Sequence, residues 1–193
     1  MEITTKEIKE LRDATGISVM QCKKALEEVG GDLEKALIIL RKKSSEIADK
    51  KSDRTLGAGV VSSYTHGTGK VGAMVTLLCE TDFVAKNEEF KTMAYDIAMH
   101  ITALSPEYLT SLEINEDDKN KAREIFEKEI KDKSENMRAT ILEGKLKSYF
   151  KDKVLLEQPF IKNPGLTIED LIKGAVQKFG ERIEIGKFVR ISI

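Results

Sequence analysis

Few residues in this sequence have the type and spacing that covalent chemistry needs. The segment HGTGK at residues 66–70 looks like part of a phosphate-binding loop, but it lacks the full GxxxxGK[ST] pattern and is not followed by a helix. A hairpin turn explains it better. His66 and His100 are the two histidines, and neither has a cysteine or an acidic residue at metal-ligand spacing. We therefore expect both at the surface or at a sheet edge, and not as catalytic bases.

The sequence also offers no redox or nucleophilic motif. Cys22 and Cys79 lie far apart and belong to no CxxC pair or zinc-type cluster, which is typical of a reduced protein. No nucleophile elbow is present, and no pair of carboxylates can be assigned to a pocket. An enzyme is not excluded by these absences, but no motif supports one, and we therefore assign no catalytic residue, metal or cofactor to the chain.

The charge balance argues for a protein partner over a nucleic acid. The chain of 193 residues carries 32 Lys and Arg against 33 Asp and Glu. A near-zero net charge disfavours both a basic grip on nucleic acid and an acidic tail. The N-terminus has no apolar signal region, and no run approaches the ~20 apolar residues that span a bilayer. We expect a cytoplasmic protein with no direct contact to nucleic acid or membrane.

Helix start and stop signals divide the first part of the chain. Thr4 and Ser18 each precede an acidic or amide residue at capping-box spacing, and Asp32 can cap a third helix. Gly16 and the pair Gly30-Gly31 provide the stops between them. These signals predict a three-helix domain that ends, with a polar helix or linker, in a first domain spanning residues 1–54.

The remaining residues, 55–193, alternate between two periodicities and predict an α+β core domain. Residues 59–66 and 71–79 are β-rich around a glycine turn, and residues 186–193 could add a third strand to a small antiparallel sheet. The second of these strands is apolar on both faces, so we expect it to be covered on both sides. Helices are predicted over residues 88–104 (with Asn87 as N-cap), 117–132, 137–150 and 167–180, the middle two as a helical hairpin, and a Pro-marked loop over residues 157–165.

Two sets of apolar residues lie where the pattern does not require them. In the second helix Val19 belongs to the core stripe, whereas Met20 points nearly opposite. Met20 is either a tolerated exposed residue or a flexible contact for a partner. Phe83 and Val84 lie on a connection of about six residues between a strand and a helix. Phe83 is either a core plug, which its residue type favours, or a probe for the cleft of another protein.

Four segments together resemble one known family. They are IKELRDATGISVMQCKKALEEVGGDLEKALIILRKKS, CETDFVAKNEEF, LLEQPFIKNPGLTIEDLI and GKFVRISI. The chain resembles the elongation factor Ts family, the guanine-nucleotide exchange factors of elongation factor Tu. The resemblance covers the chain from the first helix to the last strand, and it implies a ubiquitin-associated-like three-helix domain before an α+β core.

The resemblance also implies site residues and partners. Thr81, Asp82, Phe83 and Val84 match the loop that presses on the GTPase domain of elongation factor Tu and disturbs its Mg²⁺ and phosphate site, with Asp82 and Phe83 displayed as a wedge. Val19 and Met20 match the docking positions of the N-terminal domain. The core pattern occurs once here and twice in longer members, so we expect a homodimer and a 2:2 complex. A ubiquitin-associated-like adaptor that only tethers proteins is the alternative, although it leaves the TDFVA loop without a role.

Overall fold

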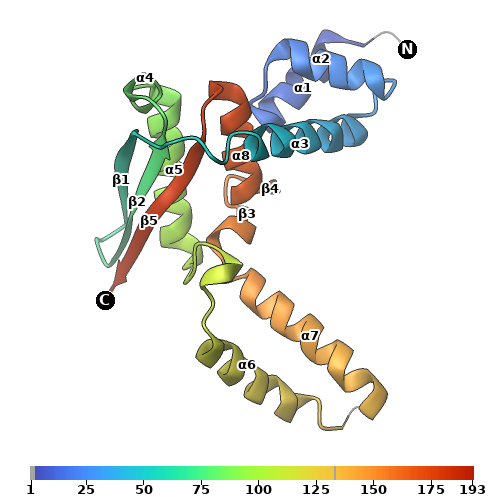
Figure 1. Ribbon diagram of the computed structural model, residues 1–193, viewed down its shortest axis with the longest axis vertical. Helices are drawn as coiled ribbons and strands as arrows, with labels where there is room; N and C mark the ends of the chain where they lie inside the picture. The colour runs from blue at the N-terminus through green and yellow to red at the C-terminus, as the bar shows by residue number, and fades with distance from the viewer. Residues whose placement is uncertain (1–2, 133) are drawn as a thin grey trace. The chain divides into compact units, whose positions relative to one another are not determined.

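The computed structural model describes residues 3–132 and 134–193 and has an α+β fold (Figure 1). The chain divides into two compact units. The first unit runs up to Thr102 and resumes at Pro159 to the last residue, and the second unit is Ala103–Gln158. The N-terminal helices and the sheet belong to the same unit. The predicted domain boundary near residue 54 therefore stays a prediction.

The first unit begins with three helices: α1 (Thr5–Thr15), α2 (Val19–Glu28) and α3 (Leu33–Asp49). The predicted caps are present, since the side chains of Thr4, Ser18 and Asp32 each accept a hydrogen bond from the first turn of their helix. A small shared core closes the three helices, and it contains Leu11, Ile17, Cys22, Ala25, Leu26, Ala36 and Leu40. The polar segment after this core continues α3 as a helix up to Asp49.

The predicted three-stranded antiparallel sheet is confirmed, with the strand order β1-β2-β5. Its strands are β1 (Ala58–His66), β2 (Val71–Cys79) and β5 (Ile183–Ser192). The HGTGK segment forms the turn between β1 and β2, where Gly67 and Gly69 adopt positive φ values that glycine tolerates. The phosphate-loop reading of that segment is thereby ruled out on structural context, because it joins two strands.

Within the part of the chain that the structure describes, one face of the sheet is covered and the other is exposed. The face that includes Val75 and Leu77 is buried, and helix α5 (Glu88–Leu104) runs along it (Figure 1). On the opposite face Val61, Met74, Val189 and Ile191 are exposed. The prediction that β2 is covered on both sides is wrong for the single chain. Both faces of β2 carry apolar side chains, but helices of the chain pack on one face alone.

The last part of the first unit contains a small hairpin and a helix. The segment predicted as a Pro-marked loop forms two short strands, β3 (Pro159–Phe160) and β4 (Asn163–Thr167). Helix α8 (Ile168–Phe179) follows, with a capping box at its start and Gly180 at its end, as predicted. The prediction of a surface position for His100 is wrong: it is fully buried, and its Nδ1 accepts a hydrogen bond from the Ile161 N–H at 3.2 Å.

The second unit is the predicted helical hairpin. Helix α6 (Glu116–Glu129) packs against α7 (Glu135–Lys151), and two 3-10 turns, Ser111–Glu113 and Leu155–Glu157, flank the pair. The ends of the unit are joined where Tyr108 and Val154 form a β-bridge. Its few buried apolar side chains lie near this base or on α6, and they are Ile114, Ala122, Ile130, Val154 and Leu155.

Candidate protein-interaction site

The segment between β2 and α5 is a helical turn, not the plain connection that the sequence suggested. Helix α4 spans Asp82–Ala85, and Thr81 precedes it as its N-cap with an extended backbone. Asn87 then caps α5, since its side-chain oxygen accepts a hydrogen bond from the Glu89 N–H at 2.9 Å. The four residues singled out by the sequence are therefore held between two regular elements.

The turn separates its two apolar side chains. Phe83 is 81% exposed, whereas Val84, the next residue, is only 4% exposed and packs beneath the turn with Ala85. The core-plug interpretation of Phe83 is therefore wrong, because Val84 occupies the buried position. Exposing an aromatic ring to water costs free energy, and this cost is removed only when another molecule covers the ring. The turn therefore exposes the Phe83 ring and buries the Val84 side chain beneath it.

Glu181, in the short connection between α8 and β5, holds the N-terminal end of this turn. One oxygen of its carboxylate accepts hydrogen bonds from the N–H groups of Glu80 and Thr81, at 3.1 and 3.0 Å. The other accepts the Thr81 hydroxyl at 2.5 Å. Because the Thr81 hydroxyl is turned toward Glu181, it does not cap α4 in the usual way. The turn is thus fixed by a residue about 100 positions later in the sequence.

Glu80 stabilises the same junction, between β2 and α4, through a second set of contacts. Its carboxylate accepts the Arg182 N–H at 2.6 Å and pairs with Arg54 at 3.2 Å. The hydrogen bond from Arg182 is the main cause that lowers the pKa of Glu80, and Arg54 lowers it further. Sequence reasoning missed Glu80, Glu181 and Arg182 as site residues, because no local pattern links partners so distant in the chain.

Charge at the tip of the turn comes from an exposed pair. Asp82 and Lys86 are one helical turn apart, and their side chains form an ion pair at 2.5 Å while remaining mostly exposed. The hydrogen bond from Lys86 lowers the pKa of Asp82, so this carboxylate is ionised at neutral pH. Below it, burial raises the pKa of the Cys79 thiol, and the nearby Glu181 carboxylate adds to the effect. Asp82 is therefore an exposed ionised group next to Phe83, and Cys79 is a protonated structural residue.

The second set of predicted contact residues lies at the start of α2. Met20 is 82% exposed, as its helical position predicted. Val19 is 49% exposed and does not belong to the helix core, so its assignment to the core stripe is wrong. Both belong to the first turn of α2, and Ser18 caps this turn through a hydrogen bond from the Gln21 N–H. The structure describes Val19 and Met20 as a small apolar surface on a capped helix and does not bring them into the α4 turn.

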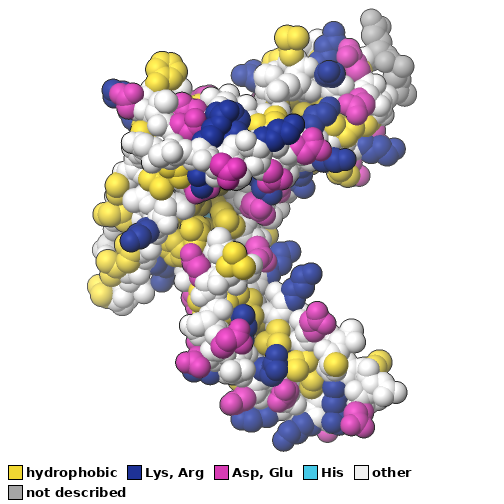
Figure 2. All heavy atoms as spheres, in the orientation of Figure 1, with side chains coloured by type: hydrophobic (Ala, Val, Ile, Leu, Met, Phe, Trp, Pro, Cys, Tyr) yellow, Lys and Arg dark blue, Asp and Glu magenta, His cyan; other side chains and the backbone are white. Residues whose placement is uncertain are grey.

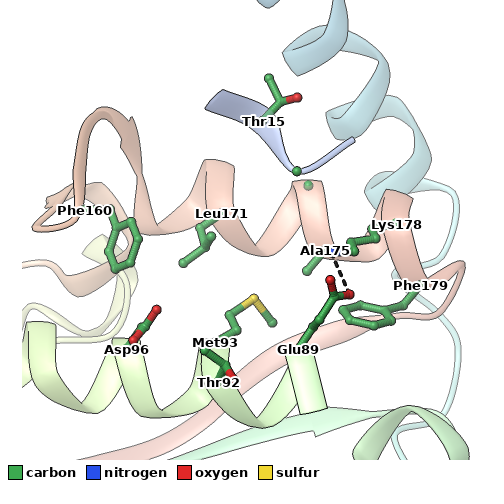
Figure 3. Close-up of a pocket in the computed structure, with 12 residues that line it drawn as sticks. Thr15, Glu89, Thr92, Met93, Asp96, Phe160, Leu171, Ala175, Lys178 and Phe179 are labelled. Carbon is green, nitrogen blue, oxygen red and sulfur yellow. Dashed lines mark ion pairs between the residues drawn. The ribbon is translucent and has the colours of Figure 1, made fainter. Parts of the chain in front are cut away.

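A cavity of about 250 Å³ lies between α5 and α8, next to the end of α1 (Figure 3). Its wall is largely apolar, with Met93, Leu171 and Phe179 among the lining residues. The Glu89 carboxylate is paired with the Lys178 ammonium at 2.8 Å, and Asp96 with Lys162 at 2.6 Å. Because its acidic groups already have cationic partners, the cavity shows no preformed site for a cation or a phosphate.

The described residues, 3–132 and 134–193, contain neither a metal-binding cluster nor a membrane-spanning helix. No group of three or more His, Cys, Asp or Glu side chains is placed there to hold a metal ion. No helix in that part of the chain has the length and apolar character to cross a membrane. The protruding turn at α4 is the feature that best fits a functional site.

Comparison with known proteins gives one consistent result. Residues 46–193 match the family model described as Elongation factor TS. A protein called elongation factor Ts from Carboxydothermus hydrogenoformans is 47% identical over 193 residues, which cover 99% of this chain and 89% of the relative. Those from Fervidobacterium nodosum and Thermodesulfovibrio yellowstonii are 45% and 47% identical, covering 100% of this chain and 99% and 97% of their own lengths.

Proposed function

This chain belongs to the elongation factor Ts family, and from that premise we propose that it is the guanine-nucleotide exchange factor of elongation factor Tu in translation elongation. The proposal places it in the cytoplasm and gives it no covalent chemistry. It binds elongation factor Tu loaded with GDP, promotes GDP release, and is displaced when GTP binds.

The observation that carries the proposal is the exposed Phe83 on a fixed turn. A single aromatic residue can displace elements of another protein only if its own support does not yield first. Here Val84 anchors the turn from below, and Glu181 holds its first residues by three hydrogen bonds. Asp82 adds a charge at the same tip. These features favour an active insertion over passive tethering by an adaptor.

The exchange mechanism follows from coupled binding. In our proposal Thr81–Val84 presses Asp82 and Phe83 into the GTPase domain, where they displace the groups that hold Mg²⁺ and the diphosphate. The exchange factor then binds the nucleotide-free partner more tightly than the GDP-bound one. By linkage, nucleotide weakens the exchange factor to the same degree, so GTP can complete the cycle. The Mg²⁺ and the nucleotide belong to the partner.

The N-terminal helices supply a second contact in this proposal. We assign them a ubiquitin-associated-like role in which the start of α2 docks on the GTPase domain. Met20, with its long and flexible side chain, is the main contact, and Val19 adds to it from the neighbouring position. This contact would raise affinity and orient the α4 turn, while the turn itself opens the nucleotide site.

A homodimer in a 2:2 complex is supported by the uncovered face of the sheet. The exposed side chains of Val61, Met74, Val189 and Ile191 share that face, and hydrophobic side chains are visible along the sheet in Figure 2. Sheets pack face to face through such surfaces, and a second copy offers an identical partner. Sedimentation of Met74→Glu should then show a monomer where the unchanged protein sediments as a dimer. A monomer for both would overturn the dimer proposal.

Release of labelled GDP from elongation factor Tu tests the main proposal. The protein should accelerate release at micromolar concentration, and Phe83→Ala should lose most of that acceleration while keeping its thermal stability. Leu112→Ala is a matched control, because Leu112 is even more exposed, at 94%, but lies in the second unit. If the unchanged protein gave no acceleration, the exchange function would be excluded. If Leu112→Ala lost as much as Phe83→Ala, the α4 turn would not be the acting site.

A further inference from the structure

Helix α7 of the second unit leaves much of its apolar surface uncovered. It is described along its whole length, Glu135–Lys151, and none of its side chains is fully buried. One row, including Tyr149, is used against α6, where the Tyr149 ring meets that of Phe126 with centroids 5.5 Å apart. The neighbouring row, Leu142, Leu146 and Phe150, repeats at one-turn spacing and is only partly buried.

This second row forms the floor of a groove of about 610 Å³ along the hairpin. Ala139 extends the floor toward the hairpin tip, and Val154 closes it at the base. The floor spans residues 139–150 of α7, or about 16 Å at 1.5 Å per residue. That length matches three turns of an additional helix, and two packed helices with an open apolar seam are the usual receptor for one.

The rims of the groove are mainly basic. Lys119 and Arg123 line it from α6, and Lys147 and Lys151 line it from α7. Lys119 is paired with Glu116, whereas Arg123, Lys147 and Lys151 form no ion pair within the described residues. Two acids also line the groove: Glu143, one turn nearer the tip than Lys147, and Glu157, beyond the end of α7. Charged side chains surround the hydrophobic surface of this hairpin in Figure 2.

We propose that this groove binds an amphipathic helix of a partner protein, with an apolar stripe flanked by acidic residues. The apolar floor would take the stripe, and the unpaired cations on both rims would meet the acids. A second copy of this groove is a poor occupant, because its basic rims would face the same charges. A nucleic acid backbone would pair with the rims but leave the floor of Leu142 and Leu146 uncovered. This inference does not depend on the exchange function.

The test uses the full-length chain and two synthetic helical peptides of about four turns. Both carry leucines at helical spacing; one has Glu on its flanks and the other has Lys at the same positions. Fluorescence anisotropy should show the Glu-flanked peptide binding at least about tenfold more tightly than the Lys-flanked one. Leu146→Asp should abolish binding. Met137→Asp is the control, because Met137 is exposed on the same helix but does not line the groove.

A charge reversal on the α7 rim of the groove provides a second test, which does not depend on whether Leu146→Asp disturbs the hairpin. Lys147→Glu combined with Lys151→Glu changes only exposed positions and should reverse the preference toward the Lys-flanked peptide. Equal binding of the two peptides, or a preference that the swap leaves unchanged, would overturn the proposal. It would equally be overturned if Leu146→Asp changed the sedimentation of the chain, which would indicate a self-interface, or if single-stranded RNA displaced the peptide.

Discussion

The two units present apolar side chains to the surroundings in opposite ways. In the first unit one aromatic residue, Phe83, stands on a turn that is anchored by Val84 and fastened by Glu181. In the second unit a row of partly buried side chains on α7 lines a groove, and no single one protrudes as Phe83 does. The first arrangement concentrates contact at a point, and the second spreads it along a helix.

The difference corresponds to how much core lies behind each surface. Large, fully buried side chains such as Phe90, Ile97 and Leu77 support the first unit close to its protruding turn. Among the described residues, the large fully buried side chains of the second unit are Val154 and Leu155, both at its base, and ion pairs such as Lys145–Glu129 lie at its surface. A point contact must keep its position to displace a partner, whereas a groove can adjust to the helix that it binds.

The largest expected effect is on the free energy of unfolding, and it differs between two phenylalanines of the first unit. Phe90 is fully buried and meets the Phe179 ring edge to face, with centroids 5.9 Å apart. Phe90→Ala should lower the free energy of unfolding by about 3–5 kcal/mol, because it removes a buried ring and leaves a cavity. Phe83→Ala should change it by no more than about 0.5 kcal/mol, because that ring is exposed. Denaturant unfolding measures both.

A similar loss of stability in both variants would contradict this prediction. That result would mean that Phe83 packs on the protein in solution and is not a free contact group. A stable Phe83→Ala variant that has lost nucleotide exchange would instead place the ring at the partner.

An intermediate effect is expected from removing the fastening carboxylate. Glu181→Ala leaves the N–H groups of Glu80 and Thr81 without their shared acceptor. We expect a loss of stability of about 1–2 kcal/mol, because water can partly replace the carboxylate at this junction. Nucleotide exchange should slow severalfold, because the turn that carries Phe83 would be less well held.

Glu184→Gln is the matched control for this change. Glu184 lies three residues after Glu181, in β5, and its carboxylate pairs with the Arg182 side chain at 2.7 Å and not with the N–H groups of the β2–α4 junction. It should leave the exchange rate unchanged. If Glu181→Ala also left the rate unchanged while Phe83→Ala abolished exchange, the α4 turn would hold its position without the hydrogen bonds to Glu181.

The fold could be predicted from the sequence wherever the signals are local. Caps at Thr4, Ser18, Asp32 and Thr167 and the glycine turn between β1 and β2 each depend on neighbouring residues, and all are present in the structure. The exposed position of Met20 also followed from helical period alone. Predictions that depended on what covers a surface were less successful, and the outer face of β2 and the buried His100 are the examples.

The candidate site was only partly predictable for the same reason. Residue type favoured a buried Phe83, and only the resemblance to a family indicated the opposite. The choice between Phe83 and Val84 as the buried residue depends on the direction of one helical turn, which no periodicity in a four-residue segment can define. Glu181 contributes through contacts across about 100 residues, and such contacts are visible only in the folded chain.

The smallest effect concerns the second unit and depends on pH. The Tyr108 hydroxyl donates a hydrogen bond to Asp118 at 2.6 Å, and this bond, together with burial, raises the pKa of Tyr108 to about 12. Because the folded state favours the protonated phenol, the stabilisation is fully present below the ordinary tyrosine pKa of about 10 and is lost as pH rises from about 10 to about 12. Tyr108→Phe should therefore cost about 1 kcal/mol at pH 7, and the difference from the unchanged protein should disappear over that range. Unfolding measured by the helical signal at pH 7, 10 and 12 tests this. No difference between the two proteins at any pH would show that Tyr108 contributes through its ring, which phenylalanine keeps, and the base of the hairpin would then gain no stability from the hydrogen bond to Asp118.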